Sequence, residues 1–267
     1  LFKISDIEKK DDIATCKIEI YQQKIHPFSE GGFHLSAVPV CEFIDLFIRN
    51  IYGKVSILNL KYLEMSCNRP VRKKIISPTV TMNSDILNKN NEKQFENDNK
   101  KNLKVLYNIE NKSFEGIIDY ESKKQVESSN TNYKTSSLEL DNNTFEILDF
   151  QIDGLKSQAE LNFVSSTISY GKLVLGPGLV LTICSQLVIV HTYALSTVEK
   201  KNKGVVVSKF KYYSKKNINS PGIINYKSII KNISSSKKSN KYIKIDVDCY
   251  FNNGDSKAEL TYYFDPF

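Results

Sequence analysis

The sequence predicts an α+β protein built from two similar units, each a curved antiparallel sheet wrapped around one apolar helix. The chain of 267 residues is long enough for two small domains with separate cores. The same order of apolar segments and turn residues occurs twice along it. In each half one apolar helix is followed by several strand-like segments, and such a helix needs a curved sheet to bury all its faces. The alternative is a single larger α+β domain.

The first unit is expected over residues 1–121. Its helix is predicted because Val40, Phe43, Ile44 and Phe47 recur at the i, i+3, i+4 spacing of one helical face. The expected elements are, in order, a strand over 15–22, a helix over 38–51, strands over 55–65 and 75–82, and a hairpin over 104–121. The Asn- and Lys-rich stretch 83–102 between them is expected to be a disordered insertion.

The second unit is expected over residues 144–267, after a linker over 122–143. Its closing hairpin is predicted by Asn252-Asn253-Gly254-Asp255, a strong turn sequence. The expected elements are a strand over 155–166, a glycine-rich segment over 171–178, a helix over 179–195, strands over 204–213 and 221–230, and a hairpin over 243–264. Two such units side by side bury sheet edges that each would expose alone.

The second helix also passes the length test for a membrane span, because residues 173–195 contain no charge. Helix-breaking residues near its start leave about 17 helical residues, and polar side chains inside it raise the cost of a span. These residues are Gly176, Pro177, Gly178, Ser185, Gln186 and His191. A helix that is apolar all round is typical of a core, so we expect a buried helix and no transmembrane span.

The composition of the chain limits the classes of partner and cofactor that we expect. The net charge is +7, but much of the lysine lies in Asn-rich stretches such as 88–104, so no nucleic-acid surface is expected. Five widely spaced cysteines without a CxxC pair predict neither disulfides nor a metal site, and no cofactor is expected. They favour a reducing intracellular compartment. A chain that begins at Leu1 fits a trimmed or mature form, from which a targeting peptide would be missing.

The segment before the first helix carries a family resemblance. Residues 32–40, Gly-Phe-His-Leu-Ser-Ala-Val-Pro-Val, resemble the hotdog-fold signature, in which a Gly-His-Phe-like turn leads into the central helix. The segment looks most like the long-chain fatty acyl-CoA thioesterases of the FcoT-like type. His34, Ala37 and Val38 fall on matching positions, Ser36 replaces an Asn of the family motif, and Asp45 falls where that family has its helix Asn.

The second unit shows a weaker likeness to the same superfamily. Ser185-Gln186-Leu187 resembles the Asn-Gln-Leu of the family's helix, and Gly176-Pro177-Gly178 resembles the Pro-Gly step before the helix in other hotdog proteins. The resemblance implies two tandem hotdog domains that hydrolyse a fatty acyl thioester of coenzyme A or an acyl carrier. A homodimer of such double hotdogs is the assembly that we expect. Hotdog 3-hydroxyacyl dehydratases carry a helix acid where this chain has Ile48 and Ile183, so dehydration is disfavoured.

A second function class stays open: a catalytically silent double hotdog that binds an acyl chain or serves as a protein-interaction scaffold. Hydrolysis needs backbone N–H groups at a helix start to hold the carbonyl oxygen, and a carboxylate to activate water. The catalytic candidates are Asp45, His34 and Glu42, with Asp45 ranked first by the resemblance. The substrate-binding candidates are Ser36, Gly176, Gly178, Ser185 and Gln186.

Each candidate also has a plain structural interpretation. Asp45 lies outside the apolar positions of its helix, which favours a solvated or sheet-edge carboxylate. His34 fits a turn histidine bonded to backbone. Ser185 and Gln186 are expected either to contact ligand or to bond to the sheet backbone, since a buried amide must find partners. His191 is expected to be a satisfied core histidine.

Overall fold

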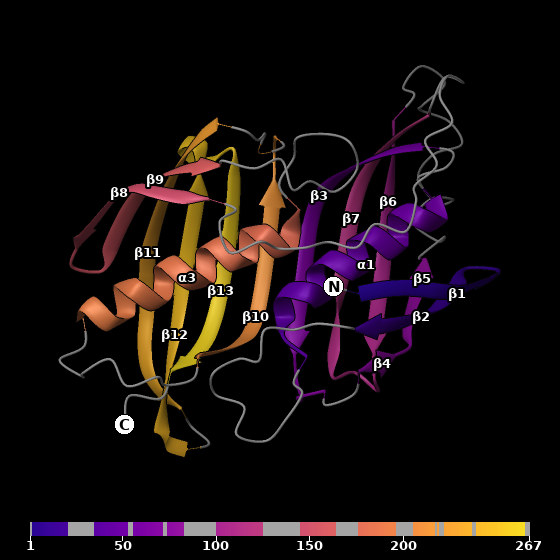
Figure 1. Cartoon of the computed structure of the whole chain (residues 1–267), viewed down its shortest axis with the longest axis horizontal. Helices are drawn as coiled ribbons and strands as arrows, with labels where there is room; N and C mark the ends of the chain where they lie inside the picture. Colours follow the sequence, from indigo (N-terminus) through magenta and orange to yellow (C-terminus); the bar gives the residue numbers. More distant parts are fainter. Residues whose placement is uncertain are drawn as a thin grey trace, which may run out of the picture.

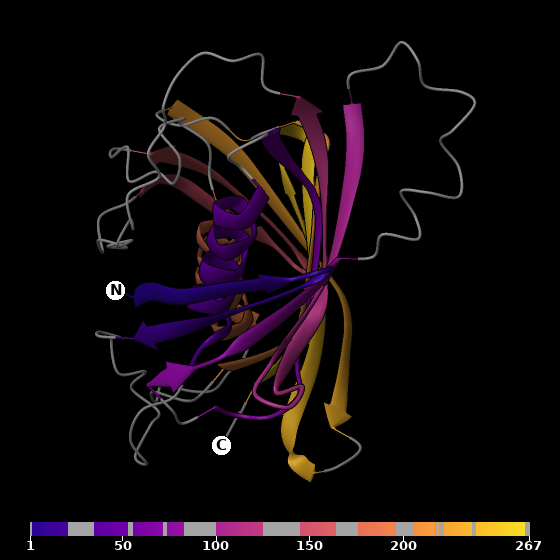
Figure 2. The ribbon, with the colours of Figure 1, turned by 90° about the vertical axis from the view of Figure 1, so that its right-hand side faces the viewer.

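The computed structural model describes residues 2–20, 35–52, 56–71, 74–82, 100–124, 145–163, 176–195, 205–216, 218, 222–236 and 239–264. These residues form one antiparallel sheet of 13 strands with two helices packed on the same face (Figures 1 and 2). The helices lie over different halves of the sheet, so each half has its own central helix.

The first half follows the expected order of elements. Alternate residues of β2 point into the core, with Ala14, Cys16 and Ile18 buried, and the apolar stripe of α1 is buried as its periodicity predicts. The elements are β1 (Phe2–Lys10), β2 (Ile13–Ile20), α1 (Ala37–Tyr52), β3 (Ser56–Cys67), β4 (Ile75–Ile76), β5 (Pro78–Met82), β6 (Lys100–Ile109) and β7 (Phe114–Lys124).

The second half repeats this order. Its closing hairpin turns where the sequence predicts, through Asn252 and Asn253, which both adopt the positive φ that asparagine tolerates. The elements are β8 (Glu146–Asp153), β9 (Lys156–Phe163), α3 (Pro177–Leu195), β10 (Val205–Ser214), β11 (Gly222–Ser236), β12 (Ser239–Phe251), the 3-10 turn η2 (Asn252–Gly254) and β13 (Ser256–Phe264).

The sheet is a duplication with mirrored strand order. The first half runs β1-β2-β5-β6-β7-β3, and the second runs β10-β13-β12-β11-β9-β8, so equivalent strands take equivalent places. The halves join through β3 and β10, which pair antiparallel from Tyr62 opposite Tyr213 to Ser66 opposite Lys209. A sheet wrapped around one helix, present twice, is the tandem hotdog architecture, and the predicted fold class is confirmed.

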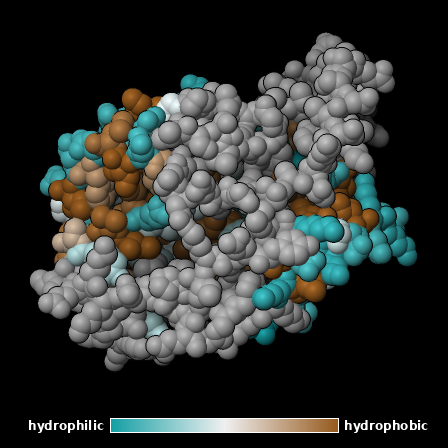
Figure 3. Space-filling view, in the orientation of Figure 1, coloured by the Kyte–Doolittle hydropathy of each residue, from teal (hydrophilic) through white to brown (hydrophobic). Residues whose placement is uncertain are grey.

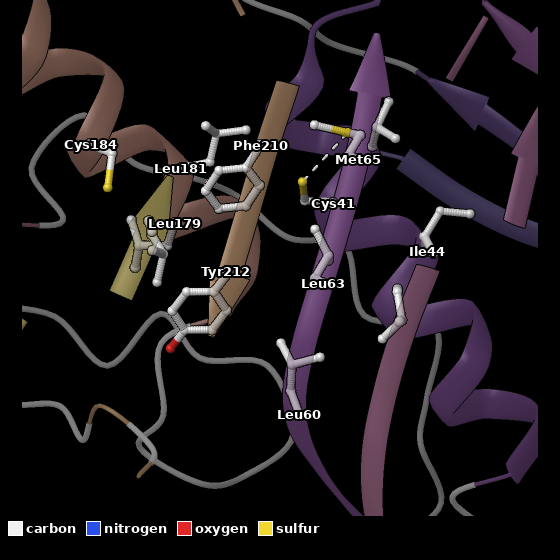
Figure 4. Packing of buried hydrophobic residues seen from close by; sticks show 14 of the residues in the cluster. Cys41, Ile44, Leu60, Leu63, Met65, Leu179, Leu181, Cys184, Phe210 and Tyr212 are labelled. Carbon is white, nitrogen blue, oxygen red and sulfur yellow. Dashed lines mark hydrogen bonds between the residues drawn. The ribbon is translucent and has the colours of Figure 1, made fainter. Parts of the chain in front are cut away.

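The two central helices are held by one continuous apolar core. Near the junction it contains Leu63 and Met65 of β3 and Phe210 of β10, all fully buried (Figure 4). The Cys41 thiol of α1 donates to Met65 Sδ at 3.7 Å. Among the described helices, α3 is long and apolar enough to cross a membrane, but its residues from Pro177 to Thr192 are largely buried in this core. That is the position predicted for a core helix.

The structure departs from the prediction at several boundaries. Strands β1 and β8 were not expected, and each completes an edge hairpin with the strand after it. Residues 100–102 of the predicted insertion belong to β6 because their backbone pairs with β7, which itself continues three residues into the predicted linker. The rest of the insertion, 83–99, and of the linker, 125–143, lies outside the described residues.

Candidate functional site

The first turns of the two helices meet at the junction of the units. A Cβ atom on Gly178 would lie 2.8 Å from the carbonyl oxygen of Val38, in the first turn of α1. Such a distance is shorter than real Cβ contacts, so glycine at this position permits the approach. The start of α3 therefore presents its backbone directly to α1.

Glu42 of α1 fills this meeting point. Its carboxylate is buried, with 1% of the residue exposed, and its Oε1 accepts a hydrogen bond of 3.1 Å from the backbone N–H of Leu179. The N–H of Gly178 also bonds to it. A negative charge is favoured here because the first N–H groups of a helix have no partner within the helix and carry a partial positive charge. The first unit thus supplies an acid to the helix start of the second.

Two glycines make room for this carboxylate. A Cβ on Gly176 would lie 2.6 Å from Glu42 Oε1, and a Cβ on Gly178 would lie 2.3 Å from Glu42 Cγ. Gly176 and Gly178, both predicted to contact substrate, therefore lie directly against the Glu42 side chain. The second oxygen, Oε2, is buried and has no hydrogen-bond partner among the described residues.

The environment of Glu42 makes its proton exchangeable near neutral pH. Burial, followed by the negative charge of nearby Asp45, raises the pKa of the Glu42 carboxyl from 4.5 to about 7. The N–H groups of Leu179 and Gly178 and the charge of Arg49 act in the opposite direction but do not cancel this shift. A carboxyl with such a pKa can give or take a proton in a reaction at physiological pH.

Asp45 has a different environment from the one expected. It is 1% exposed, so the interpretation as a solvated or sheet-edge carboxylate is wrong. Its oxygens each accept a 3.1 Å bond from Arg49 Nε, and the Tyr120 hydroxyl donates to Oδ1 at 2.5 Å. Arg49 also donates to the Leu58 carbonyl at 2.5 Å. These partners compensate the burial of the charge and tie α1 to strands β3 and β7.

The remaining predicted residues fall in several places. Ser36 lies half-buried directly before α1. The Ser185 hydroxyl is buried and bonds to no described residue, so the bond to sheet backbone is not observed within the described part of the chain. Gln186 is exposed, in contrast to the buried amide that was expected, because it lies on the outer face of α3. His34 lies outside the described residues.

The polar residues further along α3 bond within their own unit. His191 is fully buried, and its Nε2 lies 2.8 Å from the carbonyl oxygen of Gly154 in the β8–β9 turn. Since a carbonyl only accepts, Nε2 carries the proton. Thr192 and Tyr262 share a bond of 2.5 Å between their hydroxyls. His191 is thus a core histidine, as predicted, although its Nδ1 has no partner among the described residues.

No group of three or more His, Cys, Asp or Glu side chains within the described ranges is arranged to hold a metal ion. Burial raises the pKa of the Cys16 and Cys67 thiols to about 12, which makes them poor nucleophiles. The chemistry that the described site can offer is therefore that of a buried carboxyl against backbone N–H groups.

Comparison with known proteins supports the architecture. No protein-family model matches the sequence, and no curated protein matches it. Among solved structures, the tesB protein of Mycobacterium avium subs paratuberculosis is similar with a TM-score of 0.58 at 10% identity, covering 98% of this chain and 96% of that one. The acyl-CoA thioesterase II TesB2 of Mycobacterium marinum is similar with a TM-score of 0.50 at 9% identity, covering 98% and 95%. With the duplicated sheet, these likenesses show that the chain has the double hotdog fold.

Proposed function

We propose that this chain hydrolyses a fatty acyl thioester, of coenzyme A or of an acyl carrier, where Glu42 meets the start of α3. The observation that carries the proposal is the buried carboxyl of Glu42, with one oxygen on a helix N-terminal N–H and the other free of described partners. The name of the Mycobacterium marinum neighbour, an acyl-CoA thioesterase, supports the same substrate class.

The proposed reaction uses the two features of this site. The thioester oxygen displaces Glu42 Oε1 from the N–H of Leu179, and the first turn of α3 then stabilises the negative charge that develops on that oxygen. Ionised Glu42 removes a proton from a water molecule as the water oxygen bonds to the carbonyl carbon. The tetrahedral intermediate expels the thiolate, which takes the proton from Glu42, leaving a fatty acid and a free thiol.

Neighbouring residues have supporting roles in this proposal. The absence of side chains at Gly176 and Gly178 allows the thioester to approach the backbone of α3. The buried hydroxyl of Ser185, which bonds to no described residue, is available to bind substrate, and Ser36 lies beside the first turn of α1. Asp45 is already bonded to Arg49 and Tyr120, so we assign the water-activating role to Glu42 instead.

The test is hydrolysis of acyl-CoA thioesters of increasing chain length by wild type and by Glu42→Gln. The glutamine keeps the size of the side chain but cannot accept a proton, so we expect kcat/KM to fall by about 10²–10⁴-fold. Glu160→Gln, which makes the same change on the exposed face of β9, is expected to keep full activity. Turnover by Glu42→Gln equal to wild type would remove Glu42 from the reaction.

A catalytically silent double hotdog is the second candidate, and one observation favours it. Glu42 itself occupies the N–H of Leu179, the group that a thioester would need, and it is almost completely buried. In that case folded wild-type protein turns over no thioester in the panel. Native mass spectrometry of the purified protein would then reveal whether an acyl chain is bound.

A further inference from the structure

The buried carboxyls Glu42 and Asp45 lie one helical turn apart on α1, at the i, i+3 spacing that brings side chains together. Both are 1% exposed. Their neighbourhood supplies one cation, Arg49, to compensate two acids within the described part of the chain. Two buried carboxylates with one cation cannot both ionise without cost, so one of them has to hold a proton more readily than the other.

The hydrogen bonds show which carboxyl has the stabilised charge. Asp45 accepts two bonds from Arg49 Nε and one from the Tyr120 hydroxyl. The guanidinium of Arg49 is itself fixed by the Leu58 carbonyl and lies over the Tyr120 ring, 5.4 Å from its centre. Glu42 has only backbone N–H groups on one oxygen, and no partner for the other among the described residues.

We propose that Asp45 is a positioning residue for Glu42: by taking up Arg49 and Tyr120, it leaves the Glu42 carboxyl as the group in this cluster that binds and releases a proton. The inference rests on the proposed function for its role in catalysis, because a water-activating base must be the exchangeable acid of its site. The proposal that Glu42 is the acid that holds the exchangeable proton depends only on the contacts within this cluster.

The charged and titratable groups around Glu42 come from three elements. Helix α1 contributes Asp45, Arg49 and the Cys41 thiol, and strand β7 contributes the Tyr120 hydroxyl. Helix α3 contributes the N–H groups of Gly178 and Leu179 and no charged side chain among its described residues. Burial raises the pKa of both Cys41 and Tyr120, so neither competes for the proton near neutral pH.

The experiment is a carbon-13 NMR titration of protein labelled at the carboxyl carbons of aspartate and glutamate. The Glu42 and Asp45 signals are assigned by their loss in Glu42→Gln and Asp45→Asn. In wild type we expect the Glu42 signal to titrate near pH 7. A Glu42 signal that stays that of a carboxylate through the neutral range would overturn the proposal without any variant having to fold.

The variant arm tests the link between the two residues. In Asp45→Asn a like charge is lost and Arg49 is left with Glu42 as its buried acid, so the Glu42 midpoint is expected to fall by about one pH unit or more. Asp119→Asn is the matched control, because Asp119 precedes Tyr120 on β7 and its side chain points to the other face of the sheet. An unchanged midpoint in folded Asp45→Asn would contradict the proposal.

The titration also separates this inference from the proposed hydrolase. If Glu42 titrates and shifts as expected but no thioester is hydrolysed, the pairing of the two acids stands and the hydrolase does not. If hydrolysis depends on Glu42 but the Glu42 titration midpoint is the same in Asp45→Asn as in wild type, the hydrolase stands and Asp45 has no positioning role. The same pH midpoint in the NMR titration and in kcat/KM would support both.

Discussion

The two central helices occupy equivalent places in the duplicated sheet, yet they bury different chemistry. Helix α1 is buried without a break from Val40 to Ile48, and this stretch includes Glu42 and Asp45. Helix α3 is apolar, but its outer face is open, with Val190 47% and Leu195 41% exposed. Hydropathy alone predicts that α3 is more completely buried than α1, but the structure leaves residues of α3 exposed and covers α1.

The surface shows the same contrast. Hydrophobic residues reach the surface around β8, β9 and α3, on the left of Figure 3. The acids of α1 are covered, and they lie where the helix meets the other unit. In a fold built from two copies of one unit, the candidate site is therefore marked by the buried charges that one copy carries, and the apolar helix of the other copy supplies the backbone opposite them.

The largest expected effect lies in the Asp45 network. Asp45→Ala leaves Arg49 and Tyr120 without their shared acceptor, and removing one member of a buried ion pair typically costs about 3–5 kcal/mol of unfolding free energy. Urea unfolding followed by circular dichroism measures this loss. Asp149→Ala, an exposed aspartate on β8, is expected to stay within about 0.5 kcal/mol of wild type. Equal losses in the two variants would mean that α1 does not depend on its buried acid.

The next effect comes from Glu42 and depends on pH. Its pKa is about 7 in the folded chain against 4.5 as the ordinary value, so the folded state holds a proton that the unfolded state has already released. The stabilisation is complete below pH 4.5 and is lost as pH rises through 7. Glu42→Gln has no such proton, so its stability relative to wild type is expected to increase by about 2–3 kcal/mol between pH 5 and pH 8.

Urea unfolding of both proteins across this pH range measures the difference. The control is Glu160→Gln, which makes the same change at an exposed position of β9. A Glu42→Gln curve parallel to that of wild type would show that Glu42 is ionised at low pH in the folded chain and is no proton donor or acceptor near neutrality.

A smaller loss is expected at the glycine that lets the two helices meet. Gly178→Ala places a Cβ 2.3 Å from Glu42 Cγ and 2.8 Å from the Val38 carbonyl, so the helices must move apart. Overpacking of this kind costs about 1–3 kcal/mol, whereas an unconstrained glycine in a helix gains up to about 1 kcal/mol when changed to alanine. Thermal unfolding at constant pH distinguishes a loss of stability from a gain. A stabilised Gly178→Ala would show that the helices do not touch here.

The sequence predicts both helices and most of the strands, because α1 has a strong apolar periodicity and α3 is a long uncharged apolar segment. Strand β8 was missed because it is exposed along nearly its whole length and shows no alternation of buried and solvated residues. The pair of Asp45 and Arg49 was readable as an i, i+4 pair, but Tyr120 lies 75 residues further along the chain and no local pattern joins it to Asp45. The family resemblance ranked Asp45 above Glu42, while the contact with α3 that distinguishes Glu42 arises only when the two units pack together.

The smallest expected effect tests whether α3 contributes side chains as well as backbone. Gln186 was predicted to bind substrate, but it is exposed on the outer face of α3, whereas Glu42 contacts the first turn of that helix. Gln186→Ala is therefore expected to change unfolding free energy by less than about 0.5 kcal/mol and to leave thioester hydrolysis at the wild-type rate. Ser185→Ala, at the neighbouring and half-buried position, is the informative companion because the Ser185 hydroxyl is buried. A loss of activity in Gln186→Ala alone would move substrate recognition to the outer face of α3. Helix α3 would then bind the substrate while α1 supplies the catalytic carboxyl, and both halves would take part in the reaction.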